Sequence, residues 1–206
     1  MRTSTKVARG SAATALTVAG TMTLTVPAAT AAEVPAGAEL TANGSLGRLG
    51  PLTDLVVERL RVGDDVAAAK FGTDSPIDDP AREEQVLNQV RAQAAAIGLD
   101  PDAAAAFFRD QITASKVVQR GLFARWTAHP DEAPTTRPDL AQIRTRLDRL
   151  TTDLLAGLAS TVDIRAERIR CTVQLALATG SAVVLDRLDA LHRQALGTAV
   201  RSVCAA

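Results

Sequence analysis

A charged turn between two helical segments, VAAAKFGTDSPIDDPAREEQV at residues 66–86, gathers side chains that could bind a polar anion. Lys70 ends an apolar run, and Asp79, Arg82 and Glu83 follow within thirteen residues. Lysine and arginine bind carboxylates, whereas ionised Asp and Glu accept hydrogen bonds from hydroxyl groups. A second interpretation is that one helix ends and the next begins with a charged face in solvent. The spacing between these residues and polar residues in other helical segments decides between the two interpretations.

Arg59 lies eleven residues before Lys70. Eleven steps of about 100° return a helix to within roughly 20° of the same face. On a continuous helix the two cations would project from one side, about 16 Å apart along the axis. Each could also be an ordinary surface cation whose stem covers apolar surface.

Three polar residues, Gln111, Ser115 and Gln119, follow one another at intervals of four in a segment that is otherwise largely apolar. This spacing places them on one face of a helix. The stripe could face water, or it could line a polar pocket inside a helical bundle. A neighbouring helix that carries Arg59 and Lys70 would favour the pocket.

Helical periodicity recurs after residue 51, and no segment alternates usefully with period two, so the predicted class is all-α. Asp79-Pro80 and Asp100-Pro101 are typical helix starts, because Asp caps free N–H groups and Pro fits the first helical position. We expect a single-domain bundle of about six helices. The predicted helices cover residues 52–71, 80–97, 101–126 and a segment around 140–154, with two more between 162 and 200 that separate near Gly180-Ser181.

The N-terminal segment differs in kind from the rest of the chain. Three basic residues precede an uncharged run at about residues 11–26, and the small-residue stretch PAATAA follows. This order is typical of a secretory signal peptide, and the run is too short for a stable membrane span, which needs about 20 residues. The expected organisation is a signal peptide at residues 1–31 with cleavage near Ala31 or Ala32, a flexible leader at 32–51 and one domain at 52–206.

Composition argues against several function classes. Removing the signal peptide leaves 20 basic against 23 acidic residues, a formal charge of about −3, and aromatic residues make up only 2% of the chain. Neither nucleic acid nor an anionic membrane is therefore an expected partner. His129 and His192 have no ligands at metal spacing, GSLGRLG follows no strand, and no nucleophile elbow is present. We expect no metal site and no cofactor.

Cys171 and Cys204 are the only cysteines. In an exported chain an isolated pair is typical of a disulfide rather than of a metal or catalytic site. The closed loop of about 32 residues would stabilise the fold by roughly 3–4 kcal/mol in the chain-entropy model. We expect it to fasten the C-terminal helices together.

The segments ERLRVGDDVAAAK, SPIDDPAREEQV and FFRDQITASKVVQ resemble the all-helical chorismate mutases, in particular their secreted subclass. The match spans about residues 52–150. The family has an arginine, a lysine eleven residues later, and an Asp and an Arg-Glu pair nine, twelve and thirteen residues beyond that lysine. The corresponding residues here are Arg59, Lys70, Asp79, Arg82 and Glu83.

The resemblance continues beyond the turn. The family carries Ser or Thr on its third helix and Gln or Glu four residues later, and Ser115 and Gln119 match these positions. In the secreted subclass a further arginine follows the proline-rich connector, and PDLAQIR places Arg144 there. That subclass also carries a C-terminal disulfide. The resemblance therefore implies catalytic helices at residues 52–150 and supporting helices at 151–206.

What the resemblance implies is the Claisen rearrangement of chorismate to prephenate, which needs neither a nucleophile nor a cofactor. Arg59 and Arg144 would hold carboxylates with help from Arg82, and Lys70 and Gln119 would donate to the ether oxygen. Glu83 and the backbone near Asp79 would take the substrate hydroxyl, and Ser115 would support a carboxylate. Gln85 and Gln111 are weaker candidates, and Glu84 is expected to face solvent.

The resemblance also implies a homodimer whose active sites each lie within one chain. From the short N-terminal apolar run we expect no stable membrane anchor. Two alternatives stay open at this point. One is a non-enzymatic exported helical bundle that serves as a binding or sensor module. The other is a mutase that acts on a related isochorismate-type substrate.

Overall fold

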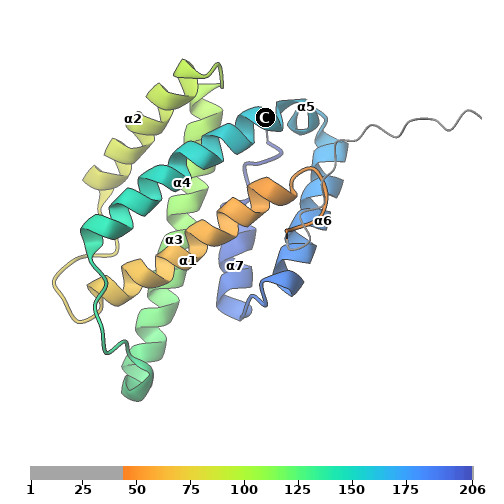
Figure 1. Ribbon diagram of the computed structural model, residues 1–206. Coiled ribbons are helices and arrows are strands. Elements are labelled where there is room, and N and C mark those ends of the chain that lie inside the picture. Colours follow the sequence, from red (N-terminus) through yellow and green to blue (C-terminus); the bar gives the residue numbers. More distant parts are fainter. Residues whose placement is uncertain (1–43, 206) are drawn as a thin grey trace, which may run out of the picture. The chain divides into compact units, whose positions relative to one another are not determined.

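The computed structural model describes residues 44–205, and the expected signal peptide and most of the expected leader lie outside them. The described part of the chain contains seven α-helices, one short 3-10 helix and no strand, so the all-α prediction is confirmed (Figure 1). The helices are α1 (Gly50–Lys70), α2 (Pro80–Ala96), α3 (Pro101–Ala128), α4 (Leu140–Ser160), α5 (Val162–Arg165), α6 (Arg168–Leu185) and α7 (Ala190–Ala199), with η1 (Pro130–Glu132) between α3 and α4.

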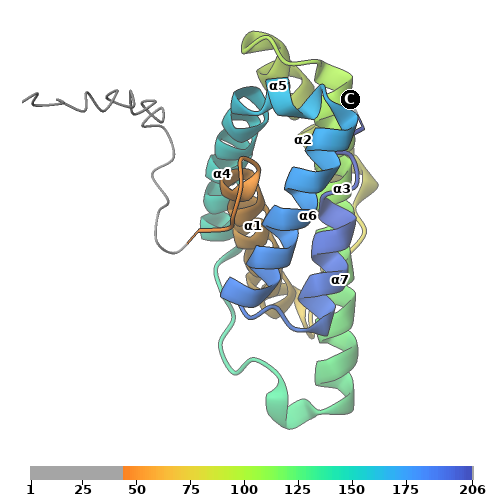
Figure 2. The ribbon, with the colours of Figure 1, turned by 90° about the vertical axis from the view of Figure 1, so that its right-hand side faces the viewer.

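Helices α1 and α3 pack on each other and form the centre of the bundle. On one side, α4 packs on α1 and α2 packs on α3, whereas α6 packs on α1 and α7 packs on α3 at the other (Figures 1 and 2). Leu60, Phe107 and Phe108 are among the fully buried side chains of this core. The central pair therefore has one face toward α2 and α4 and another toward the C-terminal helices.

Aspartate caps fix where the site-bearing helices begin. The Asp79 carboxylate accepts a hydrogen bond from the Arg82 N–H at 3.0 Å, and the Asp100 carboxylate accepts from the N–H groups of Asp102 and Ala103. Between α2 and α3, Gly98 has a φ of +75°, a left-handed conformation that favours glycine. Both predicted helix starts are confirmed, and so is the stop at Gly98.

The predicted break at Gly180-Ser181 is wrong. Helix α6 runs through this pair to Leu185, because a glycine inside a helix costs only about 1 kcal/mol relative to alanine. The Ser181 hydroxyl donates to the Ala178 carbonyl at 2.9 Å and so stays within the helical turn. The chain turns instead at Arg187, which has a φ of +52°, and Asp189 then caps α7.

The disulfide between Cys171 and Cys204 is confirmed. It joins α6 to the tail that follows α7, with the two Cα atoms 5.7 Å apart. Cys171 is fully buried in the main core. The disulfide thus links α6, which packs on α1, to the end of α7, which packs on α3.

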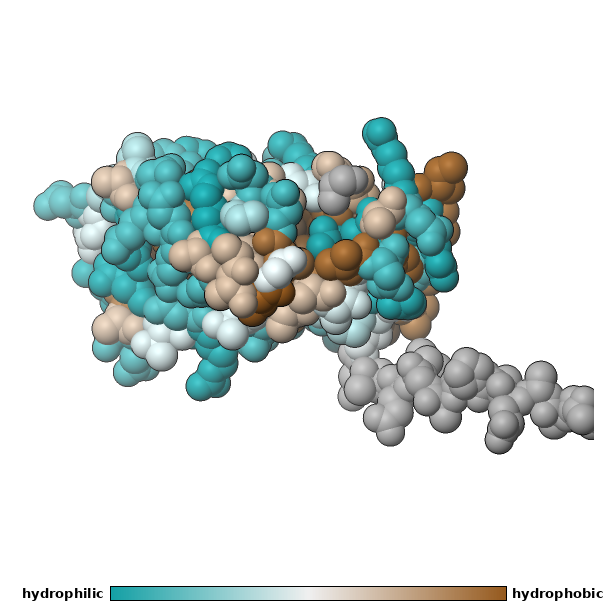
Figure 3. Space-filling model, turned by 90° about the horizontal axis from the view of Figure 1, so that it is seen from above, coloured by the Kyte–Doolittle hydropathy of each residue, from teal (hydrophilic) through white to brown (hydrophobic). Residues whose placement is uncertain are grey.

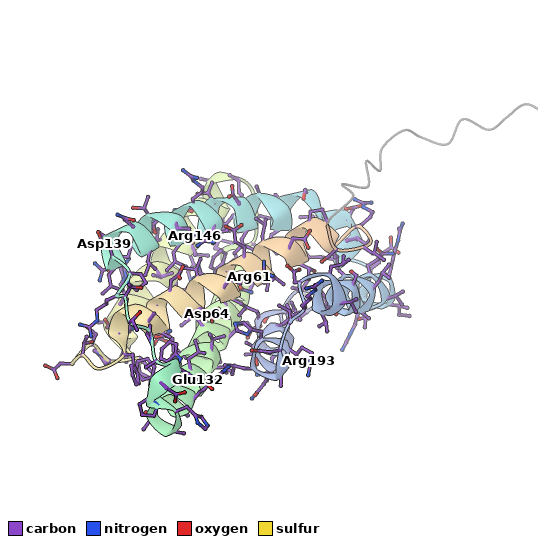
Figure 4. The ribbon with its side chains drawn as sticks, turned by 60° about the horizontal axis from the view of Figure 1, so that its bottom comes forward. Arg61, Asp64, Glu132, Asp139, Arg146 and Arg193 are labelled. Atoms are coloured by element: carbon purple, nitrogen blue, oxygen red, sulfur yellow. A yellow bond between two sulfur atoms is a disulfide. The ribbon has the colours of Figure 1, made fainter. Side chains whose placement is uncertain are left out.

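Exposed ion pairs also align the helices. Arg146 of α4 lies 3.4 Å from carboxylate oxygens of both Glu58 and Asp65 of α1, and Arg61 binds Asp186 at 2.7 Å (Figure 4). Exposed pairs are each worth about 0–1 kcal/mol. They therefore contribute little to the stability of the fold.

Apolar side chains are also found on the surface. Seen from above, the protein is mostly hydrophilic, with apolar groups near the middle of this face and on the side where α6 lies in Figure 1 (Figure 3). Helix α6 exposes Ile169, Val173 and Leu177 at intervals of about one turn, and Val184 two turns later. None of the helices within residues 44–205 is long and apolar enough to cross a membrane.

His192 of α7 ties that helix to α1. Its Nε2 lies 3.0 Å from the Asp64 carboxylate, and its Nδ1 lies 2.8 Å from the Asp189 carboxylate. The hydrogen bond with Asp64 outweighs partial burial and, with that of Asp189, raises the pKa of His192 from 6.5 to about 9. The imidazolium is therefore the form that joins the two helices at neutral pH.

This pKa shift predicts a pH-dependent stability. Because the pKa is higher in the folded state, the contribution of His192 is complete below about pH 6.5 and is lost as pH rises through about 9. Urea unfolding should give a larger unfolding free energy at pH 6 than at pH 9.5. His192→Gln should reduce this difference, whereas His129→Gln in the exposed connector should leave it unchanged. An equal pH dependence in wild type and His192→Gln would contradict the role.

Candidate active site

A cavity of about 300 Å³ lies between α1, α2, α3 and α4, and residues of the loop at 71–79 also line it. This is the size at which small-molecule sites begin. The cavity wall includes all eight residues that the sequence pattern singled out. They are Arg59, Lys70, Asp79, Arg82, Glu83, Ser115, Gln119 and Arg144.

Arg59 is a buried cation at the wall of the cavity, with 8% of its surface exposed. Its Nε and Nη1 are buried and have no hydrogen-bond partner among residues 44–205, while the guanidinium carbon lies 5.8 Å from the centre of the Phe108 ring. Burial lowers the pKa of Arg59 to about 10, against the opposing charge of Asp148. The guanidinium therefore stays charged at neutral pH and has free donors for an anion.

Lys70 reaches the same cavity from the last turn of α1. Its Nζ donates to the Pro76 carbonyl at 2.7 Å, which holds the ammonium beside the loop and leaves two further donors. Burial lowers the pKa of Lys70, the Asp79 carboxylate opposes this, and the nearby charge of Arg144 lowers it further. The predicted common face for Arg59 and Lys70 is confirmed, because both line one cavity.

Arg82 and Glu83 come from the first turn of α2, which the Asp79 cap fixes. The exposed Arg82 side chain donates to Gln85 at 2.7 Å through Nη1, so its guanidinium has donors to spare. Glu83 instead accepts from Lys116 of α3. The start of α2 thus supplies one cation and one carboxylate to the same wall.

Ser115 and Gln119 present a polar pair from α3. The Gln119 Nε2 donates to the Ser115 hydroxyl at 3.2 Å, while the Gln119 Oε1 is buried without a partner. A hydroxyl both donates and accepts, so a half-turn of the amide would keep this hydrogen bond and present Nε2 at the position of Oε1. The pair can therefore offer either an acceptor or a donor from this buried position.

Arg144 reaches the cavity from α4, whose start is fixed by the Asp139 carboxylate, which accepts from the Ala141 N–H at 2.7 Å. Arg144 is exposed, unlike Arg59. One turn later, Asp148 also lines the cavity. The two arginines therefore occupy a deep and an outer position of one site.

Four polar lining residues were not found from the sequence, namely Ser75, Lys116, Asp148 and Thr151. Lys116 directly follows Ser115, but its significance depends on partners in other elements, which no spacing within α3 reveals. The structure does not bring the two weaker candidates to the cavity wall. Gln111 donates to the Ala199 carbonyl at 2.8 Å and so faces α7, and Gln85 does not line the cavity. Glu84 is exposed, as expected.

The charges of the site favour a dianion. Five cations line the cavity, namely Arg59, Lys70, Arg82, Lys116 and Arg144, against the carboxylates of Asp79, Glu83 and Asp148. The excess of two positive charges complements two carboxylates, which guanidinium groups bind through paired hydrogen bonds. Within residues 44–205, no group of His, Cys, Asp and Glu is placed to hold a metal ion.

Comparisons with known proteins identify the family of this chain. The family described as chorismate mutase type II matches residues 51–120. The secreted chorismate mutase of Mycobacterium tuberculosis is 34% identical over 84% of this chain and 86% of its own length, and that of Mycolicibacterium smegmatis is 34% identical over 76% and 86%. The crystal structure of chorismate mutase from Burkholderia thailandensis superposes with a TM-score of 0.72 at 41% identity, covering 76% of this chain and 99% of that one. This chain belongs to the chorismate mutase family.

Proposed function

We propose that the protein is a secreted chorismate mutase that converts chorismate to prephenate by rearrangement within one substrate molecule. The observation that carries the proposal is Arg59, a buried residue of the cavity wall whose Nε and Nη1 have no hydrogen-bond partner within residues 44–205, in a cavity with an excess of two positive charges. Chorismate carries two carboxylates, which complement that excess. The family to which the chain belongs supports the same reaction.

The rearrangement breaks the ether C–O bond while a new C–C bond forms, and negative charge grows on the ether oxygen. An enzyme accelerates such a step by holding the folded conformer and by placing donors where the charge develops. No proton is transferred and no covalent intermediate forms. The chain's own residues thus need only to bind, orient and stabilise charge.

We assign the carboxylates of chorismate to Arg59 and Arg144, with Arg82 and Ser115 in support. The ether oxygen lies between Lys70 and Gln119, each of which is worth about 3–4 kcal/mol if it acts as other oxyanion donors do. Such a position for Lys70 is compatible with its contact to Pro76, because two of its three donors stay available. The Glu83 carboxylate accepts a hydrogen bond from the substrate hydroxyl, and the backbone near Asp79 helps to hold that hydroxyl.

The proposal includes export and assembly. The relatives from Mycobacterium tuberculosis and Mycolicibacterium smegmatis carry the word secreted in their names, which supports a signal peptide ending near Ala31. The homodimer and the absence of a membrane anchor stay predictions. The exposed apolar row on α6 supports a contact with a second copy, which light scattering of the mature protein would test.

Turnover of chorismate tests the central proposal. The purified mature protein should remove chorismate absorbance, and mass spectrometry or NMR should identify prephenate as the product. Lys70→Met should lose most of this activity, which excludes a contaminating host enzyme. A protein that shows helical circular dichroism without turnover would favour the non-enzymatic bundle. Turnover of an isochorismate-type substrate alone would favour a mutase specific for that substrate.

Gln119 predicts a flat pH profile, because an amide donates a hydrogen bond regardless of pH. We expect the kcat of the wild type to change little from pH 5 to 8. Gln119→Glu should become dependent on acid, since a carboxyl donates only when protonated, and should lose up to about 100-fold in kcat at pH 8. Gln142→Glu, exposed on α4 and outside the cavity, is the matched control. A flat profile for Gln119→Glu would argue against Gln119 as the donor.

Arg144 is tested by removing its side chain. Arg144→Ala should lower kcat/KM by about 10–100-fold, the range expected when charged hydrogen bonds to a carboxylate are lost. Arg149→Ala, which removes an exposed arginine of α4 outside the cavity, should leave kcat/KM within twofold. An unchanged kcat/KM for Arg144→Ala would remove Arg144 from the site.

A further inference from the structure

Lys116 connects three elements around the cavity. Its Nζ lies 3.0 Å from each oxygen of the Glu83 carboxylate and 3.3 Å from the Asp78 carboxylate. Helix α3 is thereby tied to the first turn of α2 and to the loop at residues 71–79. An ammonium group has three donors, so these contacts use all of them.

The contact with both oxygens of Glu83 restricts how this carboxylate can turn. A Glu side chain ordinarily rotates freely about its terminal bond, whose rotamer preference is broad. With one cation against both oxygens, the remaining lone pairs keep one orientation at the cavity wall. Those lone pairs are available to accept a hydrogen bond from a hydroxyl group.

The pair is also sheltered from water. The Lys116 and Glu83 side chains are 18% and 27% exposed, so solvent screens their attraction less than it screens the exposed ion pairs of this protein. Burial lowers the pKa of Lys116, but the hydrogen bonds with Glu83 and Asp78 outweigh it and hold this pKa above its ordinary value. Lys116 therefore remains charged throughout the neutral range.

We propose that Lys116 is a positioning residue, which holds the Glu83 carboxylate in the orientation that receives the substrate hydroxyl. This inference rests on the proposed function, because Glu83 is assigned there as the hydroxyl acceptor. Lys116 itself acts through Glu83 and does not bind the substrate. Nothing in the spacing of charged residues along the chain assigns this role.

The chain offers a matched control for the loop contact. Arg120, one turn after Lys116 on α3, binds the same Asp78 carboxylate at 2.6 Å but does not contact Glu83 or line the cavity. Lys116→Met removes the contacts with both Glu83 and Asp78, whereas Arg120→Met removes a contact with Asp78 alone. A difference between the two variants thus reports the Glu83 contact.

The expected kinetic signature is a change in KM with little change in kcat. A hydroxyl acceptor binds the ground state and the transition state alike, so its misplacement weakens binding without slowing the chemical step. Lys116→Met should raise KM about tenfold, the loss expected for one hydrogen bond to a charged group, and leave kcat within about threefold. Lys116→Arg should restore KM, and Arg120→Met should keep KM within twofold.

A double-mutant cycle separates positioning from direct binding. If Lys116 acts through Glu83, adding Lys116→Met to Glu83→Gln should change KM by less than twofold. If the tenfold effect persists in the Glu83→Gln background, Lys116 binds the substrate directly and the proposal is overturned. An unchanged KM in Lys116→Met alone, or an equal rise in Arg120→Met, would overturn it as well.

Two further measurements keep the test decisive. Circular dichroism melting checks that each variant folds, and Lys116→Gln replaces Lys116→Met if the latter does not. If the wild type shows no turnover, the proposed function fails, and the same cycle is measured as the Kd of chorismate by calorimetry. A coupled loss of affinity would then still support positioning, and independent losses would reject it.

Discussion

An arginine held inside a helical bundle without a carboxylate partner is the constraint on which the site depends. Burying an unpaired charge is costly, and the usual outcome is either a partner or loss of the charge. Arg59 has no carboxylate partner within residues 44–205, and it keeps its charge because its pKa of about 10 remains far above neutral pH. The face of Phe108 and the more distant Asp148 reduce the cost only in part. A ligand carboxylate would therefore satisfy donors that the protein leaves free.

The remaining helices make this arrangement stable. Helix α1 carries Arg59 and Lys70 toward α2 and α4, while its opposite side packs on α6 and α7. The disulfide and the pair of His192 with Asp64 join those supporting helices to one another and to α1. Site residues on rigid helices keep their geometry better than residues on free loops. Helices α6 and α7 thus help to keep α1 and its site residues in place against α2, α3 and α4.

The sequence predicted the features that depend on local rules. Asp79-Pro80 and Asp100-Pro101 start helices through contacts within one turn, and the spacing from Arg59 to Lys70 follows from helix geometry alone. These rules, together with the family resemblance, were sufficient to name eight of the residues that line the cavity. Their separate roles still await the kinetic tests.

Features that depend on packing between helices were not predictable in this way. Gln111 shares the spacing of Ser115 and Gln119, yet a small rotation around α3 turns it toward the Ala199 carbonyl. The contacts of Lys116 join residues 33 and 38 positions apart in the sequence, and they form only because α2 and the loop pack on α3. Likewise, Gly180 did not mark a break, because one glycine costs only about 1 kcal/mol in a helix and α6, which contains it, packs on α1.

A single chain supplies all eight of the predicted site residues. A site shared between two copies would lose residues whenever the copies separate, and that happens as their concentration falls below the dissociation constant. A site contained in one copy has no such threshold. For a protein released into a large volume, the geometry of the cavity would therefore persist at any dilution at which the single chain stays folded.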